Sequence, residues 1–570
     1  MGLSRSHARL VVAFLIGVAL VRVMGTYRTL GQTSDEPADL AAGMEWLDRA
    51  RFDYAPLHPP LARVAAALGP WLDGRHSMGN SDVWLEGSAI LLDGPDYRRT
   101  LVLARFGTLP FFLLAILGTW WWGRRLASLE GGILSVLLVS TLPTMLANAG
   151  LATTDMALTG MFVVTTVLAV RWLERVDTGS SIALGCGVAL TILAKLSALL
   201  FLPIAGLVIL ACRFLTRERA SPPGRQVIRQ AVIAALSMAL MLWAGYRFSV
   251  GTVADTRDIP PASRASPPAT TGLTAARIIP APELVVGIRK LKARATKGSK
   301  SFLLGEVGYR GWWYYFPVAI LVKTPVPFLI LTAAGMVVLL WRRPRSWWTL
   351  VPILVPVCIV LAVIPSRINL GVRHVLPIFP LLAAVAGAGA AALTQLPARR
   401  PIFGKLLVTV LIAWQVASTP RSHPDYLSWF NFLAGSRPDF VLVDADFDWG
   451  QDMNALGDTL RARGAKSVTL AGALQRTPAS IRARLGFPPS KPMRPFTWTP
   501  GYVAVDLYGL HIGDSKNWRV PPDAFAWLEN YVPVAMIGKT IRLYDLPEDP
   551  YLARPRFSNA PIPPGRRDSL

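Results

Sequence analysis

The sequence predicts a polytopic α-helical membrane protein with a C-terminal α/β domain. Of its 570 residues, 52% are hydrophobic and only 16% are charged, whereas soluble domains carry about 25% charged residues. Apolar stretches long enough for membrane helices recur from residue 10 to residue 418, and the chain beyond them alternates short strand-like and helix-like runs. We therefore expect about eleven transmembrane helices followed by one smaller domain.

The predicted spans follow one another closely. A span needs roughly 20 apolar residues, or fewer where flanking Arg or Lys side chains reach the interface. The first span follows Arg5 and Arg9 and has no small-x-small cleavage site behind it, so we expect it to be retained. The run 181–213 is too long for one helix and is interrupted by Lys195. The eleven segments are 10–25, 101–121, 131–148, 155–172, 181–195, 197–213, 228–248, 314–341, 347–365, 374–396 and 402–418.

The charge distribution predicts the orientation of these spans in a cytoplasmic membrane. The formal net charge is +24, but the basic residues lie mostly in alternate short loops between spans, which indicates a positive-inside bias and excludes nucleic acid as a partner. The first long loop, 26–100, is instead rich in Asp and Glu. We therefore expect a cytoplasmic N-terminus, and loops 26–100 and 249–312 and the C-terminal domain on the periplasmic or exterior side.

The outer segments carry further local signals. Loop 26–100 is expected to form two short helices, 39–50 and 60–71, which rest on the membrane surface. Loop 249–312 is basic, and its segment 283–297 is either a helix on anionic headgroups or a solvated charged loop. Residues 1–420 are thus the transmembrane domain, 421–550 an α/β domain and 551–570 a disordered tail. Within 421–550, strands are expected at 440–443, 468–470, 502–505, 532–537 and 540–544, and helices at 452–464 and 522–530.

Nine ionisable residues stand out because the topology places all of them at the outer ends of spans or in outer loops. Each has an ordinary interpretation as well, such as loop solubility, a helix-start carboxylate, a snorkelling lysine or a headgroup anchor. Their gathering on one face is the stronger signal, since charge beside a membrane core is costly and usually functional. The candidate catalytic residues are Asp35, Glu36 and Asp155, and the candidate phosphate- or substrate-binding residues are His58, Arg63, Lys195, Arg367, Arg373 and His374.

This set of side chains favours one kind of chemistry. Cations at the outer face can hold the phosphate of a carrier lipid and stabilise it as a leaving group, and a carboxylate can take a proton from an attacking hydroxyl. An anionic phosphate leaves without a general acid, and enough Arg and Lys make a metal unnecessary. The three cysteines lie in apolar runs and form no metal or disulfide motif. The pattern therefore indicates inverting sugar transfer from a polyprenyl-phosphate-sugar donor lipid, with no cofactor and no metal.

The layout resembles the membrane glycosyltransferases of the GT-C fold, and within them family 39 and its bacterial relatives, the protein O-mannosyltransferases and the lipid A aminoarabinose transferase. The resemblance covers residues 10–420. It implies that Asp35 is the catalytic base, Asp155 the second acidic residue, and Lys195 and Arg373 phosphate or headgroup contacts, with an extracytoplasmic protein, lipid or glycan as acceptor. The matching motifs are Asp35-Glu36, His58-Pro59-Pro60-Leu61-Ala62-Arg63, Ala152-Thr153-Thr154-Asp155, Leu193-Ala194-Lys195, Gly311 to Pro317, Val322-Lys323-Thr324-Pro325 and Arg373 to Pro380.

The chain departs from the family pattern at two places. Lys195 is followed by Leu196-Ser197, where many relatives have Gly-Pro. The C-terminal domain, with Asp446 to Asp452, resembles the tails of poorly characterised bacterial members. Its acids either contribute to acceptor binding or form a turn at Asp448 and a helix cap at Asp452.

Two other classes of function remain as alternatives. A transporter or lipid flippase would place its site near the bilayer midplane, within broken helices and internal repeats. Only the Lys195 break fits that description. In the other alternative, the helices only anchor a binding module in 420–570 to the membrane. That function does not explain the charged residues of loop 26–100.

Overall fold

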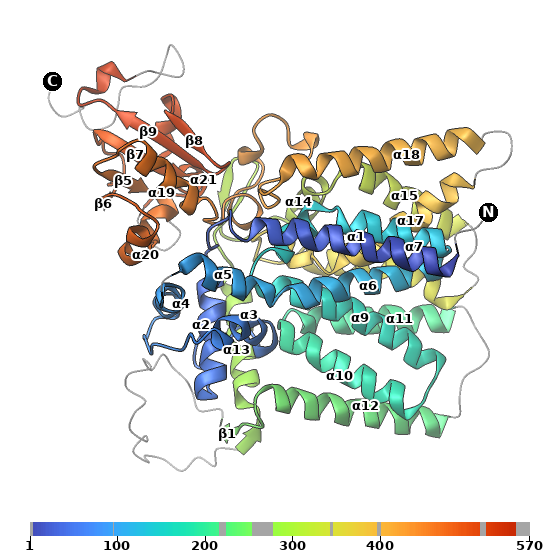
Figure 1. The fold of residues 1–570 in the computed structure, drawn as a ribbon. Coiled ribbons are helices and arrows are strands. Elements are labelled where there is room, and N and C mark those ends of the chain that lie inside the picture. Colours follow the sequence, from blue (N-terminus) through green and yellow to red (C-terminus); the bar gives the residue numbers. More distant parts are fainter. Residues whose placement is uncertain are drawn as a thin grey trace.

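The computed structural model describes residues 4–94, 96–215, 224–252, 278–341, 346–395, 401–513 and 520–553. Its helices form one bundle with roughly parallel axes, and a small sheet built by the C-terminal part lies at one end of that bundle (Figure 1). The predicted fold class, a helical membrane protein with a C-terminal α/β part, is confirmed. Of the predicted disordered tail, Tyr551 and Leu552 instead belong to a short 3-10 turn (η10, Pro550–Leu552), and residues 554–570 lie outside the described residues.

Within the described ranges, six helices are long and apolar enough to cross a membrane, or up to eight if each of two bent pairs is one span. The predicted segments 181–195, 347–365 and 374–396 are also helical but shorter: α10 (Thr178–Ala194), η2 with α16 (Trp347–Val363) and α17 (Ile378–Thr394). Every predicted span thus coincides with a helix, while the number of eleven spans stays a prediction. The six long helices are Arg5–Thr26 (α1), Tyr97–Leu126 (α5 and α6), Thr154–Glu174 (α9), Ala198–Leu215 (α11), Gly224–Gly245 (α12) and Ile402–Ser422 (α18 and η4).

Three interruptions shape the bundle, and two of them coincide with proline. Helices α7 (Leu129–Ser140) and α8 (Pro143–Ala149) meet at 64°, and α14 (Tyr315–Lys323) and α15 (Val326–Trp341) meet at 112°. Pro143 and Pro325 lie at these bends; proline cannot donate a backbone N–H and pushes its predecessor out of helical geometry. The third interruption is Lys195, whose backbone is extended between α10 and α11. The predicted break is confirmed there.

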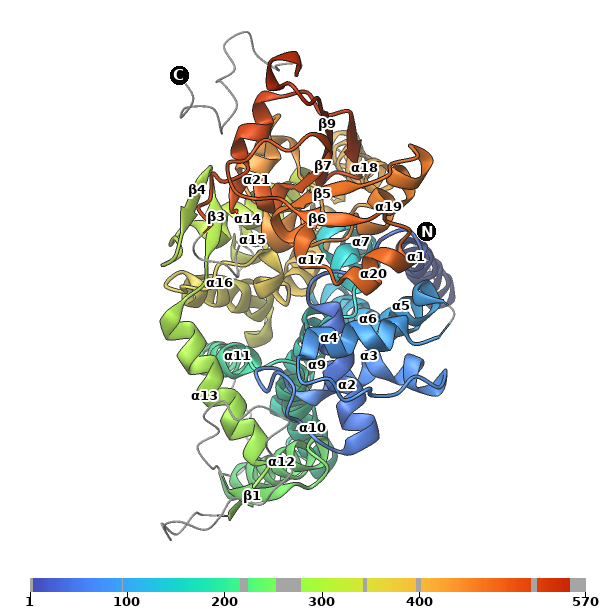
Figure 2. The same cartoon turned by 90° about the vertical axis from the view of Figure 1, so that its left-hand side faces the viewer.

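The bundle end that carries the sheet also carries several helices across its axis (Figures 1 and 2). Both predicted short helices of loop 26–100 form, as α2 (Glu36–Arg49) and α3 (Pro60–Leu72), and α4 (Val83–Leu92) follows. Helices α2 and α3 pack so closely that a Cβ atom on Gly43 would lie 2.0 Å from the carbonyl oxygen of Arg63. Only glycine permits this contact, which fixes α3 against α2.

The second outer loop contains a long basic helix between two small hairpins. Strand β1 (Val250–Thr252) pairs with β2 (Ile278–Pro280), and β3 (Ser301–Leu303) pairs with β4 (Glu306–Gly308), both antiparallel. Between them lies α13 (Pro282–Lys297), so segment 283–297 adopts the helical one of its two expected forms, and α13 exposes its basic side chains. It lies across the same end of the bundle (Figure 2). Its contact with lipid headgroups stays a prediction.

The C-terminal sheet has five strands in the order β6-β5-β7-β9-β8. Strand β5 (Val468–Ala471) is parallel to β6 (Ser490–Pro492) and to β7 (Gly501–Asp506). Strand β9 (Ile541–Leu546) is antiparallel to β7 and to β8 (Ala535–Ile537). The predicted helix at 452–464 forms as α19 (Met453–Ala462), and α20 (Ala479–Arg484) and α21 (Leu507–His511) are short.

Two predicted elements of this part are wrong. The apolar run Phe440–Val443 forms no strand: Pro438–Phe440 is a 3-10 turn (η6), and Leu442 and Val443 are buried by tertiary packing instead of strand pairing. The predicted helix 522–530 shrinks to a 3-10 turn over Ala526–Asn530 (η9). Prolines lie at the start of both regions, Pro438 two residues before the first run and Pro521 and Pro522 at the second, and a proline donates no backbone hydrogen bond.

The core of the bundle continues into the C-terminal part. Fully buried Trp122, Phe112 and Phe162 belong to the same packed cluster as Leu442 and Trp449. The C-terminal part therefore packs into the bundle as well as against it. This packing brings residues 442–449 beside the outer loops.

Candidate active site

Four of the predicted residues form a continuous line of alternating charge. The Lys195 ammonium lies 2.5 Å from Asp155 Oδ1, and Arg373 Nη1 lies 3.5 Å from Asp155 Oδ2. The same Arg373 nitrogen donates to Asp35 Oδ2 at 3.0 Å. These side chains come from four distant segments of the chain. The structure thus brings together residues that the sequence only placed on one face.

Local structure explains each position in the line. Asp35 precedes α2 and Asp155 is in the first turn of α9, where the helix dipole favours a carboxylate. Lys195 occupies the break between α10 and α11. Arg373 belongs to a 3-10 turn (η3, Val372–Val375) that follows Gly371, whose φ of +106° suits glycine. The four charged groups therefore come from two helix starts, one helix break and one 3-10 turn.

The line is buried at one end and open at the other. Asp155 and Lys195 are buried, whereas the Asp35 side chain is 44% exposed. Buried ions need partners close by, and Asp155 has a cation on each side. The accessible carboxylate is therefore Asp35, and Arg373 holds it in place. Such a carboxylate can accept a proton from a bound hydroxyl.

Two half-buried histidines near Lys195 each have one buried, unused ring nitrogen. Among the described residues, neither His58 Nδ1 nor His374 Nε2 has a hydrogen-bond partner. Both imidazoles interact electrostatically with Lys195 and with Arg294 of α13. Burial, Arg63 and Lys195 lower the pKa of His58 well below its usual value. It is therefore neutral at pH 7, and its ring can donate or accept a hydrogen bond to a ligand.

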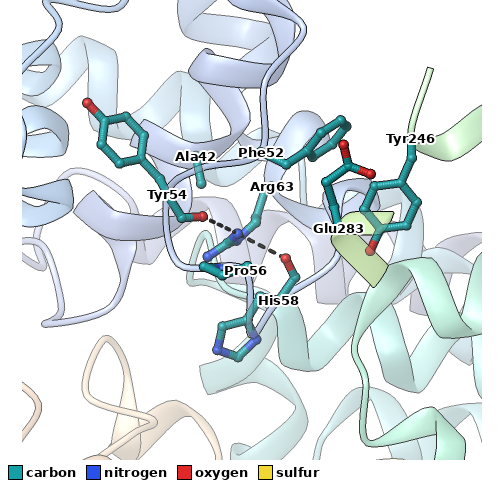
Figure 3. Close-up of a pocket in the computed structure, with 8 residues that line it drawn as sticks. All are labelled: Ala42, Phe52, Tyr54, Pro56, His58, Arg63, Tyr246 and Glu283. Atoms are coloured by element: carbon teal, nitrogen blue, oxygen red, sulfur yellow. Dashed lines mark hydrogen bonds between the residues drawn. The ribbon is translucent and has the colours of Figure 1, made fainter. Parts of the chain in front are cut away.

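Arg63 holds the loop that carries His58. Its Nε donates to Asp39 Oδ1 at 3.0 Å, and its Nη1 donates to the carbonyl oxygens of His58 at 3.0 Å and Tyr54 at 3.4 Å. Figure 3 shows the two bonds from Arg63 to the carbonyl oxygens of His58 and Tyr54, in a small pocket that Glu283 of α13 also lines. Burial raises the pKa of Asp39 to about 6, against the opposing effect of Arg63. Arg63 therefore supports the loop that carries His58 and is not itself a member of the line of charges.

Both carboxylate oxygens of Glu36 accept hydrogen bonds from other groups of the protein. Its oxygens accept two bonds from Arg105, at 2.8 and 2.9 Å, and backbone N–H groups of Thr33 and Ala152 donate to them at 2.8 and 2.9 Å. Burial opposes ionisation, but Arg105 and these hydrogen bonds lower the pKa of Glu36. The side chain is 1% exposed, so it ties the Asp35 loop to α5 and to the start of α9.

Arg367 is not brought to the line. It is exposed, and its Nη1 donates to the carbonyl oxygen of Thr296 at 3.1 Å, near the end of α13. Arg105, Arg294 and Trp449 are site neighbours that the sequence reasoning missed. Arg105 lies inside a predicted span, and a charge at such a position is itself a signal of function. The other two carried no comparable signal.

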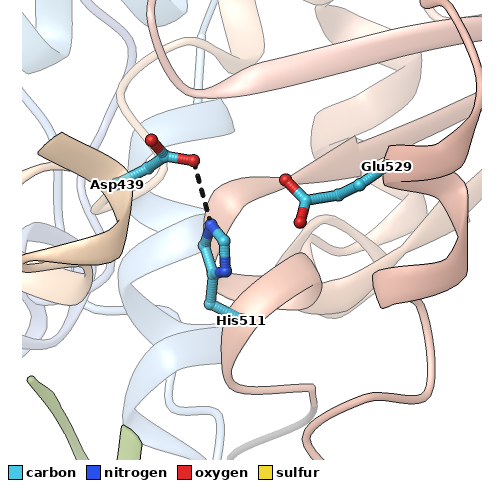
Figure 4. Close-up of side chains that lie close together, drawn as sticks. All are labelled: Asp439, His511 and Glu529. Atoms are coloured by element: carbon cyan, nitrogen blue, oxygen red, sulfur yellow. Dashed lines mark hydrogen bonds and ion pairs between the residues drawn. The ribbon is translucent and has the colours of Figure 1, made fainter. Parts of the chain in front are cut away.

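A cluster of potential metal ligands lies in the C-terminal part, apart from the line. Asp439, His511 and Glu529 bring their ligand atoms within 4.8 Å of one another (Figure 4). Arg437 bonds to both acids at 2.8 and 2.9 Å, and Arg542 at 3.3 and 2.5 Å. Two guanidinium groups thus balance two carboxylates, and the cluster is an ion-pair network.

Comparison with models of protein families finds no match, and none is found among curated proteins. Among solved structures, the chain is similar to ArnT from Cupriavidus metallidurans bound to undecaprenyl phosphate, with 14% identity over 93% of this chain and 97% of that chain, at a TM-score of 0.49. It is also similar to the apo oligosaccharyltransferase of Archaeoglobus fulgidus (11% identity, 82% and 63% of the chains, TM-score 0.45) and to AglB of that organism with an inhibitory peptide and a dolichol-phosphate (11%, 86% and 69%, 0.44). At TM-scores below 0.5 these similarities carry no argument about the chemistry, which rests on the site itself.

Proposed function

We propose that this protein is an inverting glycosyltransferase that moves a sugar from a polyprenyl-phosphate-linked donor to an acceptor on the outer side of the cytoplasmic membrane. The observation that carries this proposal is the line from Lys195 through Asp155 and Arg373 to Asp35. It ends in an accessible carboxylate beside the guanidinium group of Arg373. A base next to an anion-binding region is the arrangement that this reaction requires.

The donor phosphate is proposed to lie at the Lys195 end. The four charges of the line cancel, so further positive charge is needed to bind a phosphate. Helix α13 supplies it with Arg294, which interacts with both His58 and His374. The unused nitrogens of these imidazoles can donate to phosphate oxygens once protonated on that side. The polyprenyl chain would extend along the apolar helices.

The acceptor hydroxyl is proposed to bind at Asp35. Asp35 takes its proton while the oxygen attacks the anomeric carbon, and the bond to the phosphate oxygen breaks on the opposite face. The phosphate leaves as an anion held by the cations, so no proton has to be delivered to it. Attack and departure on opposite faces invert the anomeric centre. Glu36 and Arg63 position this machinery through their buried contacts.

An alternative function, a transporter or lipid flippase, has less support. Transport sites lie near the bilayer midplane, whereas this line lies at the bundle end with α2 and α3. Purified protein that forms a new glycosidic bond distinguishes the two functions.

The test compares Asp35→Asn with the wild type in proteoliposomes. The donor is the labelled lipid fraction of deletion cells, which should accumulate the sugar-phosphate lipid, and the acceptor is their envelope material. Loss of a general base lowers the rate by roughly 10²- to 10⁴-fold, with unchanged membrane insertion. Asp545→Asn, an exposed carboxylate on β9, is the matched control. Full activity of Asp35→Asn would overturn the assignment.

A further inference from the structure

The segment Asp444–Gln451 of the C-terminal part contacts both the loop that leads to Asp35 and the side chain of Arg373. The Trp449 carbonyl accepts from Ser34 N–H at 3.0 Å, and the Gln451 carbonyl accepts from Gly31 N–H at 2.8 Å. Two backbone hydrogen bonds thus hold residues 31–34, which lead into Asp35. The loop before α2 is therefore shaped by residues more than 400 positions away.

The same segment holds Arg373. The Trp449 ring lies 4.1 Å from the Arg373 guanidinium carbon, a cation–π contact. Asp446 Oδ1 accepts from the backbone N–H of Val372 at 2.8 Å. Lys323, at the end of α14, donates to the Asp446 carbonyl at 2.6 Å. The turn that carries Arg373 is thus fixed from the C-terminal side.

Asp448 of this segment and Asp452 just after it anchor the segment to the rest of the C-terminal part. Asp448 Oδ2 accepts from Tyr508 N–H at 3.1 Å, and Asp452 Oδ2 accepts from the N–H and hydroxyl of Thr540 at 3.2 and 2.8 Å. Asp452 precedes α19 but makes no side-chain cap bond. The segment is therefore held on one side by the rest of the C-terminal part and contacts the turn of Arg373 on the other.

The side chain of Asp444 takes part neither in the contacts with the Arg373 turn nor in those with the rest of the C-terminal part that are described above. It is half-buried, and its φ of +57° is a left-handed conformation that Asp tolerates. Its carbonyl closes the turn by accepting from Phe447 and Asp448 N–H. Within the described ranges, no cation lies within ion-pair distance of its carboxylate. Burial raises its pKa to about 6, and Asp35 and Asp446 act in the same direction against Arg373.

The position of Asp444 along the line indicates which substrate it meets. It interacts with Arg373 and Asp35, at the open end, whereas the histidines interact with Lys195 at the other end. Under the proposed function, which this inference assumes, the open end is where the acceptor hydroxyl binds. A carboxylate that makes no ion pair within the described residues can accept a hydrogen bond there from a second hydroxyl or an ammonium group. It also repels an anionic acceptor group.

We propose that the segment Asp444–Gln451 forms the acceptor side of the reaction site, with Asp444 as an acceptor-binding residue and Trp449 as a positioning residue for Arg373. The acceptor class is one that presents a neutral or cationic hydrogen-bond donor beside its reacting hydroxyl. The C-terminal part thereby contributes to acceptor choice.

The test measures transfer by full-length Asp444→Asn in proteoliposomes, with the labelled lipid fraction and envelope material of deletion cells as substrates. Asparagine keeps the left-handed backbone, so the variant retains the turn. We expect the half-saturating amount of envelope material to rise about tenfold or more, the effect of losing a hydrogen bond to a charged group. The maximal rate and the half-saturating donor concentration should change less than threefold. Trp449→Leu should instead lower the maximal rate, and Trp449→Phe should restore it.

Asp35→Asn and Asp545→Asn accompany these variants. An unchanged acceptor dependence in Asp444→Asn, with an active wild type, would overturn this inference alone. Loss of maximal rate without a change in acceptor dependence would also overturn it. Absence of transfer by the wild-type protein would instead overturn the proposed function. Equal rates for Trp449→Leu and the wild type would remove the positioning role.

Discussion

Glu36→Gln should destabilise the protein far more than Asp35→Asn, although the two residues are neighbours. Glu36 is 1% exposed and neutralises Arg105, which is fully buried. Arg105 also donates to the carbonyl oxygens of Tyr27, Leu30 and Gly31. Glutamine removes the counter-charge and turns an amide N–H₂ toward one of the guanidinium N–H groups. Breaking one side of a buried pair costs about 3–5 kcal/mol.

Asp35→Asn should cost much less in stability. Its side chain is 44% exposed and pairs with Arg373 at the surface of the site, and exposed pairs contribute roughly 0–1 kcal/mol. Arg373 keeps Asp155 and Trp449 as neighbours in that variant. The two substitutions therefore separate a positioning carboxylate from a reacting one.

The assay is unfolding in mixed micelles by titration with SDS, followed by tryptophan fluorescence. The free energy of unfolding should fall by about 3–5 kcal/mol for Glu36→Gln and by less than about 1 kcal/mol for Asp35→Asn. Glu306→Gln, an exposed glutamate on β4, is the control for the chemical change. If Glu36→Gln unfolded like the wild type while losing transfer activity, Glu36 would take part in the chemistry and the positioning argument would be refuted.

Two further predictions concern pH and orientation. Asp444, which faces Arg373, Asp35 and Asp446, has a pKa of about 6, so its charged form is lost as the pH falls through 6. Its ionised fraction changes about tenfold between pH 7 and pH 5. The half-saturating acceptor amount should rise about tenfold over that range in the wild type and stay flat in Asp444→Asn; equal pH profiles would contradict this. Reporter fusions after Arg345 and Thr419 should report inside and outside, respectively, and the reverse result would overturn the orientation.

Sequence periodicity and charge predicted the helices well, because they depend on local composition. The interruption at Lys195 and the helical structure of both short segments of loop 26–100 are confirmed, while the position of these helices on the membrane surface stays a prediction. A polar residue in an apolar run and a proline at a helix start can be recognised in the local sequence, without knowing what the segment packs against. The strand expected at Phe440–Val443 failed because burial of an apolar run does not reveal whether its backbone pairs with a strand.

The gathering of Asp35, Asp155, Lys195 and Arg373 followed from topology, since every other loop end returns to the same face. The interaction partner of each individual residue could not be predicted from the topology. Nothing in the local sequence indicates that Glu36 would meet Arg105 across 69 positions, or that Arg367 would turn to the end of α13. Such pairings depend on how helices rotate and pack, which one sequence does not specify.

The contact of Trp449 with Arg373 has a consequence for the order in which the protein matures. The bundle helices leave the ribosome first, and the residues that contact Arg373 and the Asp35 loop are synthesised after them. A nascent chain that has already entered the membrane still lacks these contacts. The turn of Arg373 and the Asp35 loop therefore gain these contacts only after residues 444–451 have been made, and a chain interrupted before them would insert in the membrane with the proposed site incomplete.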